Sequence, residues 1–141
     1  MLDINFVREH SDIVKKSERK RGRDGRTVDQ FMLFDEEWKK NLKVVEALKH
    51  KRNVVSEEIN KAKKEKKDKL ADSKIKEMRD VADSIKKEEE KVNQLLEDRN
   101  KALKSIGNIL DESVPVGKDD SENVEQKKVG SIPTFNFPIK D

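Results

Sequence analysis

Cysteine and tyrosine are absent from this chain, and tryptophan occurs once. Without cysteine, the chain forms no disulfide and no thiolate metal site. Proline and glycine are scarce, and neither occurs anywhere in residues 27–106, so nothing in that stretch forces a helix to break. No apolar run is long enough to cross a membrane, and the first residues lack a secretion signal. We therefore expect a cytoplasmic protein without a membrane partner.

Hydrophobic residues are also scarce, at 32% of 141 residues, whereas charged residues reach 45%. A compact globule of this length needs more apolar material, but an elongated helical structure needs only a stripe of it. The 33 basic and 30 acidic residues leave a net charge of only +3. A nucleic-acid partner must therefore be argued from local clusters of charge and not from the whole chain.

Two stripes of apolar residues recur at alternating steps of three and four, a pattern typical of a coiled coil. The first stripe comprises Phe31, Phe34, Trp38, Val45, Leu48, Val55, Ile59 and Ala62. The second comprises Ala71, Ile75, Met78, Ala82, Ile85, Val92, Leu96, Leu103, Ile106 and Leu110. Residues 61–69, between the stripes, contain no apolar side chain larger than alanine. We predict an all-α fold, a long antiparallel two-helix coiled-coil hairpin with a lysine-rich tip.

The predicted arm spans residues 1–110, followed by an extended linker and the start of a further domain over 111–141. Within the arm we expect small helices over 4–20, a long helix over 28–66, a tip over 61–70 and a second long helix over 71–106. Asp3 and Ser11 are suited to cap the two small helices, which carry too few apolar residues to fold alone. We expect these helices to pack against the base of the hairpin.

Folding the stripes about the tip places particular residues opposite one another. Trp38 comes close to Arg99, and a guanidinium on an indole face would explain a charge within the second stripe. Arg52 and Glu89 fall on the same stretch of the hairpin. If they pair, they fix the register at some cost in stability, and if they do not, one of them must tilt to solvent.

After Leu110 the helical period ends. Residues 126–129 have the pattern of a short strand, and Phe135, Phe137 and Ile139 alternate as on a strand with one buried face. Little remains in this chain to bury them, so we expect another domain to follow.

Catalytic signals are weak. His10 and His50 are the only histidines, with no second reactive group at a fixed spacing, and no glycine-rich phosphate loop is present. We predict no catalytic residue, no metal site and no cofactor in this chain.

The candidate binding residues are cations at and beside the tip: Lys49, Lys51, Arg52, Lys61, Lys63, Lys64, Lys66, Lys67, Lys69, Lys74 and Arg79. They either keep the end of the arm soluble or contact phosphates, in which case binding is strongly dependent on salt. No aromatic residue lies near the tip, so recognition would follow the shape of the backbone and not base stacking. The basic stretch 19–26 leaves the same two alternatives open, a solvated linker or a phosphate contact.

Several stretches resemble the N-terminal region of the seryl-tRNA synthetases, also called serine–tRNA ligases. They are residues 1–9 with 12–14 and 20–22, residues 33–38, residues 51–59, and residues 133–137 with 140–141. Residues 113–125 carry the most specific match, to a segment between the arm and the catalytic domain. The resemblance covers nearly the whole chain.

This resemblance implies an arm that grips the long variable arm and elbow of serine tRNA. It also implies a parent enzyme that charges serine tRNA using ATP and Mg²⁺ and that dimerises through its class II catalytic domain. The catalytic motifs lie beyond this chain, which should be inactive and monomeric alone. The alternative is a structural or chaperone-like coiled-coil hairpin that binds protein.

Overall fold

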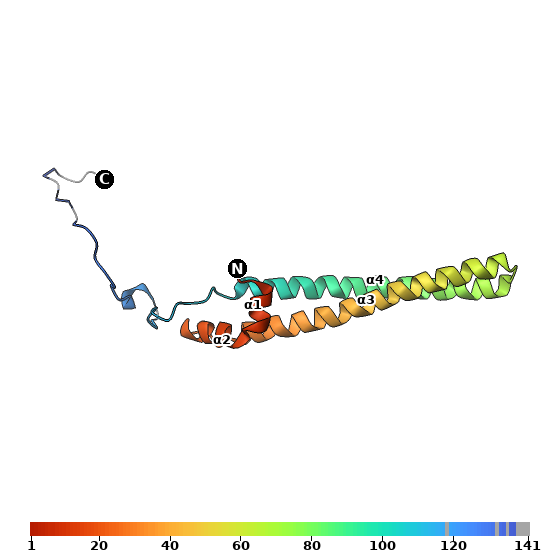
Figure 1. The fold of residues 1–141 in the computed structure, drawn as a ribbon, viewed down its shortest axis with the longest axis horizontal. Helices are drawn as coiled ribbons and strands as arrows, with labels where there is room; N and C mark the ends of the chain where they lie inside the picture. Colours follow the sequence, from red (N-terminus) through yellow and green to blue (C-terminus); the bar gives the residue numbers. More distant parts are fainter. Residues whose placement is uncertain (118, 132, 135, 138–141) are drawn as a thin grey trace.

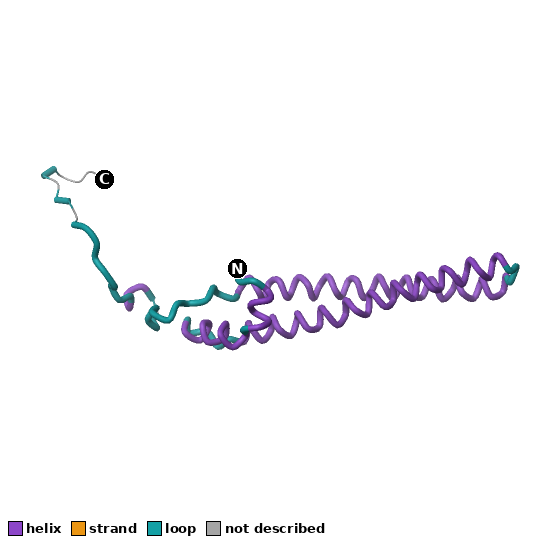
Figure 2. The backbone as a smooth tube through the Cα atoms, viewed as in Figure 1, coloured by secondary structure: helices purple, strands orange, loops and turns teal. Residues whose placement is uncertain are grey.

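The computed structural model describes residues 1–117, 119–131, 133–134 and 136–137. The chain runs through α1 (Ile4–Glu9), α2 (Ser11–Lys20), α3 (Arg26–Lys64), α4 (Asp68–Ser105) and a short 3-10 helix, η1 (Asp120–Glu122). In Figure 1, α3 and α4 lie antiparallel along one long rod, with α1 and α2 at the end opposite the turn. Figure 2 colours the described chain as helix and loop without a strand. The predicted all-α hairpin is confirmed.

The two short helices, α1 and α2, are capped differently at their N-termini. Asp3 caps α1, because its carboxylate accepts hydrogen bonds from the backbone N–H groups of Asn5 and Phe6 at 2.9 and 3.0 Å. The expected cap by Ser11 is wrong, since Ser11 is already helical and His10 is the capping residue. His10 makes no side-chain cap bond and instead places its ring 4.9 Å from that of Phe6.

The long helices differ from the predicted bounds by a few residues. α3 begins at Arg26 and not at residue 28, directly after Gly25, whose φ of 76° lies in the left-handed region that glycine favours. It ends at Lys64, and α4 begins at Asp68, three residues before the predicted start. The turn is thus much shorter than the predicted tip. At about 1.5 Å per residue, the 39 residues of α3 extend the arm by about 58 Å.

A small core holds α1 and α2 against the base of the hairpin, as predicted. Its buried members come from all four helices and the residue after α4: Val7, Val14, Val28, Phe31, Ala102, Leu103 and Ile106. Leu2, Ile4 and Phe6 pack against it, partly buried. The short helices therefore owe their stability to this shared apolar contact and not to their own length.

Along the arm, two positions of the predicted stripes are shifted by one residue. Val81 is buried and Ala82 is exposed, because the larger apolar side chain takes the position facing α3. Asp35 is buried where Phe34 was expected, and Phe34 packs at its margin against the base core. The stripe of α3 therefore contains a buried charge.

Three further expectations concern ion pairing in the arm and the structure of the linker. Glu89 pairs with Lys49, at 2.7 Å, and Arg52 is exposed, so Arg52 and Glu89 do not pair and the second alternative holds. Residues 126–129 form no strand. Phe137 is 64% exposed, whereas Phe135 and Ile139 lie outside the described residues. No helix within the described ranges is long and apolar enough to span a membrane.

Candidate nucleic-acid interface

The turn at the end of the arm is closed by backbone hydrogen bonds. The N–H of Lys67 bonds to the carbonyl of Ala62 at 2.9 Å, and the N–H of Lys66 bonds to that of Lys63 at 3.1 Å. These two bonds form a Schellman motif, which satisfies the last carbonyls of α3. The motif requires one residue in the left-handed backbone region, and Lys66, with a φ of 56°, occupies that position. The turn is therefore tight although it contains no glycine.

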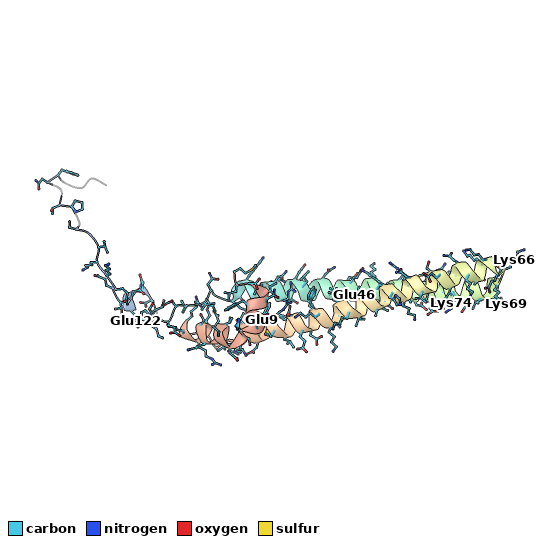
Figure 3. The ribbon with its side chains drawn as sticks, viewed as in Figure 1. Glu9, Glu46, Lys66, Lys69, Lys74 and Glu122 are labelled. Atoms are coloured by element: carbon cyan, nitrogen blue, oxygen red, sulfur yellow. The ribbon has the colours of Figure 1, made fainter. Side chains whose placement is uncertain are left out.

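The six lysines of residues 61–69 all lie exposed around this turn. They are Lys61, Lys63, Lys64, Lys66, Lys67 and Lys69. Figure 3 shows Lys66 and Lys69 at the far end of the arm. Glu65 pairs with Lys67 at 2.7 Å, and this hydrogen bond lowers the pKa of Glu65. One local carboxylate thus offsets Lys67, and the other lysines form no ion pair with a described residue. We call these six residues the tip lysines.

Each of three predicted cations beside the tip binds a carboxylate of the opposite helix, and Lys74 also binds one on its own helix. Lys49 pairs with Glu89 at 2.7 Å, and Lys51 pairs with Glu77 at 3.1 Å. Lys74 contacts both Glu58 and Glu77, at 2.8 and 2.9 Å. Its hydrogen bond to Glu58, followed by that to Glu77, raises the pKa of Lys74. These lysines join α3 to α4, so much of their charge is balanced within the arm.

The other two predicted flanking cations differ from these lysines. Arg52 and Arg79 are exposed and carry no ion pair to any residue that the structure describes. Together with the tip lysines, they form the part of the predicted set that is open to a polyanion.

The basic stretch 19–26 lies at the other end of the arm, and most of its cations bond within the chain. Lys20 donates to the carbonyls of Asp111 and Glu112 at 2.8 and 3.0 Å. Arg23 donates to the carbonyl of Ser105 at 3.1 Å. We call this stretch the clamp, because it bonds to the end of α4 and to the residues that follow it, although Arg19, Arg23 and Arg26 remain exposed.

The clamp, together with Ser17 and Glu18 of α2, holds residues 107–112, which we call the exit strap because the chain leaves the arm through them. The carboxylate of Glu18, 1% exposed, accepts a hydrogen bond from the N–H of Gly107 at 3.0 Å. The hydroxyl of Ser17 accepts one from the N–H of Leu110 at 3.0 Å and another from Arg21. A Cβ on Gly107 would lie 2.8 Å from the guanidinium carbon of Arg21, so a larger residue there would displace the Arg21 side chain.

A second polar cluster joins three helices near the base. Asp35, 2% exposed, binds Arg8 of α1 through two hydrogen bonds, at 2.6 and 2.8 Å. Lys39 lies 2.8 Å from the same carboxylate, and Arg99 of α4 lies 3.5 Å away. Burial alone raises the pKa of Asp35, but the hydrogen bonds from Arg8 and Lys39 outweigh burial and lower it. Asp35 therefore stays ionised and ties α1 and α4 to α3.

Comparison with known proteins agrees with this architecture. The family model for the seryl-tRNA synthetase N-terminal domain matches residues 1–110, more than three quarters of the chain. The chain belongs to this family. The serine–tRNA ligase of Carboxydothermus hydrogenoformans is 46% identical over 140 residues, and that of Staphylococcus haemolyticus is 41% identical over 140 residues. Each alignment covers 99% of this chain but 32% of the relative, so the chain spans about a third of their length.

Solved structures of seryl-tRNA synthetases share the fold. The Pyrococcus horikoshii enzyme, complexed with ATP, matches with a TM-score of 0.77 and 36% identity over 88% of this chain and 28% of its own. The cytoplasmic serine–tRNA ligase of Naegleria fowleri, in complex with AMP, has a TM-score of 0.76 and 26% identity. That match covers 93% of this chain and 35% of its own.

In this seryl-tRNA synthetase N-terminal domain, the residues that sequence reasoning missed are the buried carboxylates. In the sequence, Asp35 is one of several acidic residues in the early turns of a long helix. Glu18 has no sequence feature that predicts its burial. Asp35 does stand three residues before Trp38 and four after Phe31, which is a stripe position. His50 is exposed. Across the described ranges, no three His, Cys, Asp or Glu side chains gather as a metal site.

Proposed function

We propose that this domain is the RNA-binding arm of a serine–tRNA ligase and that the tip lysines contact the phosphates of serine tRNA. The observation that supports the proposal is the concentration of six exposed lysines within nine residues at the end of a long, stiff arm. The net charge of the whole chain is only +3, whereas positive charge is concentrated at the projecting end of the arm. Such a point suits a polyanion that lies some distance from the body of the enzyme.

The chemistry of the tip favours recognition of backbone shape. Ammonium groups contact phosphates as point charges and carry no base preference, and residues 61–70 include no aromatic side chain for stacking. An RNA with a long variable arm presents an additional double-stranded backbone beside the elbow, and the arm would select it by the placement of that backbone. The ion pairs made by Lys49, Lys51 and Lys74 would keep the rod straight enough to place the tip.

The similarity to serine–tRNA ligases supports a proposal about the activity of the parent protein. A complete serine–tRNA ligase would activate serine with ATP and Mg²⁺ and charge serine tRNA, using residues outside this chain and dimerising through that part. This chain alone would be inactive and monomeric. It would also bind tRNA weakly, because attachment to the enzyme body raises the effective concentration of the arm at the tRNA.

A salt titration with a matched pair of variants tests the proposal. Fluorescence anisotropy would compare serine tRNA with a tRNA that has a short variable arm. The tip variant carries Lys63→Glu, Lys64→Glu and Lys69→Glu, and the control carries Lys40→Glu, Lys43→Glu and Lys104→Glu. All six lysines are exposed, and the control lysines lie nearer the base.

We expect the tip variant to weaken binding at least about tenfold and to reduce the slope of log K against log salt by roughly two, with a small effect in the control. Equal affinities of the tip variant and the unsubstituted domain would overturn the proposal. That result would favour the alternative, a hairpin whose end binds protein. Equal affinity for both tRNAs, even in a complete enzyme, would contradict selection by the variable arm.

A further inference from the structure

A groove of about 680 Å³ lies between α2 and the exit strap, at the base of the arm. We propose that this groove is the docking surface for the enzyme body, meaning the portion of a serine–tRNA ligase that follows this domain. The inference goes beyond the proposed RNA binding and does not depend on it. It concerns how the arm is held at its base and not what the tip contacts.

The groove is apolar inside and mainly cationic at its margin, where Lys16, Arg19 and Lys20 outnumber the one acidic residue, Glu112. Ile13 of α2 and Ile109, Leu110 and Val116 beyond α4 supply the apolar side chains. Ile13 is 49% exposed and Val116 is 71% exposed, although the neighbouring Val14 is fully buried in the base core. Such a cluster of exposed aliphatic side chains is costly to leave in water and marks a contact surface.

The wall formed by the exit strap is held in place. Ser17 and Glu18 accept hydrogen bonds from backbone N–H groups of residues 107–112, and Lys20 donates to a backbone carbonyl there, so this backbone is fixed against α2. A peptide segment without secondary structure would otherwise move independently of the helix. Because the clamp prevents this, the groove is a preformed surface, and an occupant does not have to order it on binding.

The position of the groove identifies its occupant. The relatives are about three times as long as the matched region, and the matched family is the N-terminal domain, so the body of the enzyme follows this domain in sequence. The chain reaches that body through the strap, which is itself one wall of the groove. α2, which forms the other wall of the groove, lies at the end of the rod opposite the tip (Figure 1). A body docked there leaves the tip lysines exposed.

Two other occupants fit less well. An RNA would have to place its polar backbone against the apolar interior of the groove. Lys20, at the margin, is already bonded to carbonyls of the exit strap. A second copy of this chain, docked groove to groove, would bring the exposed Lys16 and Arg19 of each copy toward those of the other. The cationic margin favours instead a partner that carries acidic residues around an apolar contact.

Cysteine labelling tests the proposal cleanly, because this chain contains no cysteine. Single substitutions Ile13→Cys and Val116→Cys report on the groove. Val44→Cys, in the middle of α3 and 42% exposed, is a control of similar exposure to Ile13. Maleimide labelling rates are measured for the 141-residue chain and for the same chain joined to the remaining length of the Carboxydothermus enzyme. Peptide mass mapping distinguishes these sites from cysteines of the added portion.

We expect both groove cysteines to react at least about tenfold more slowly in the joined protein, with Val44→Cys unchanged. A second substitution, Ile13→Asp, should restore fast labelling at Val116→Cys, with circular dichroism confirming that the helices remain. Unchanged rates at both groove cysteines overturn the proposal. So does protection in the short chain that grows with its concentration, which indicates self-association, or protection that requires added tRNA. None of these outcomes depends on whether the tip binds RNA.

Discussion

The guanidinium carbon of Arg99 lies 4.5 Å from the centre of the Trp38 ring, across the interface between α4 and α3. Arg99 is 7% exposed, so this cation–π contact is largely shielded from water. It explains why a charged residue occupies a position where the second stripe otherwise has apolar residues. The contact also fixes the register of the two helices near the base.

Replacing Arg99 by leucine should lower the free energy of unfolding by about 1–2 kcal/mol, the value of a partly desolvated cation–π contact. Asp35 retains Arg8 and Lys39, so the loss reports mainly on the indole. Urea denaturation followed by circular dichroism measures the change, and Trp38, the only tryptophan, gives an independent fluorescence signal. An Arg99→Leu variant as stable as the original domain would show that the stacking contributes nothing.

The buried carboxylate of Asp35 leads to a prediction about acid. Because its pKa is lowered in the folded state, Asp35 contributes stability at neutral pH, and that contribution is lost as the pH falls below about 4 toward the lowered value. Asp35→Asn should destabilise the domain by about 3 kcal/mol at neutral pH, since it leaves Arg8 and Arg99 without their carboxylate.

Urea denaturation over a pH series checks this prediction. Between neutral pH and pH about 3, the Asp35→Asn variant should lose less stability than the original domain, because it lacks the titrating group. Asp29→Asn is the matched control. Its carboxylate pairs with Lys15 but is 63% exposed, so its loss should cost less than about 1 kcal/mol. Identical pH dependence in the Asp35→Asn variant and the original domain would contradict the role of Asp35.

Arg99 and Asp35 show how far the sequence could predict this structure. The Arg99 contact was predictable, because counting along two stripes from a common turn places Trp38 opposite it. Asp35 was not, because its first partner, Arg8, is 27 residues away on a separate helix. In a chain in which 45% of residues are charged, a buried carboxylate looks like any exposed one until its partners are located.

The clamp at the base was unpredictable for the same reason. Locally, residues 19–26 are a run of positive charge with two glycines, and charge runs are usually solvated. The partner of Arg23 is Ser105, 82 residues away at the end of α4. The partners of Lys20 lie 91 and 92 residues away in the exit strap, which has no periodic pattern of its own. By contrast, the exposure of the tip lysines follows from composition alone, since the segment contains nothing that a core would bury.

Glu18 is the residue on which the clamp most depends. Glu18→Ala leaves the half-buried N–H of Gly107 without its acceptor and Arg23 without its carboxylate, and should cost about 1–3 kcal/mol. Amide hydrogen exchange should show faster exchange at Gly107 and Leu110 but not in the middle of α4. Glu46→Ala, an exposed change in the middle of α3 (Figure 3), should stay within about 0.5 kcal/mol of the original domain. Unchanged exchange at Gly107 would contradict the clamp.

The turn at the tip carries backbone strain at Lys66, whose positive φ is unfavourable for any residue with a Cβ. Lys66→Gly should relieve this strain and raise the stability of the arm by about 0.5–1 kcal/mol, since the freedom that glycine adds to the unfolded chain offsets part of the gain. Lys64→Gly removes the same charge from within the last turn of α3, where glycine is unfavourable, and should lower stability by about 0.5–1 kcal/mol.

Thermal unfolding compares the two glycine variants directly. Opposite signs of the change would show that the conformation at residue 66, and not the loss of a positive charge, determines stability at the turn. Destabilisation by both would contradict the strain at Lys66. If the tip lysines bind phosphate, the Lys66→Gly variant should also bind tRNA more weakly while folding more stably. At this position of the turn, glycine would be the more stable residue. A lysine that lowers the stability of the free arm is expected there if its positive charge is needed for binding.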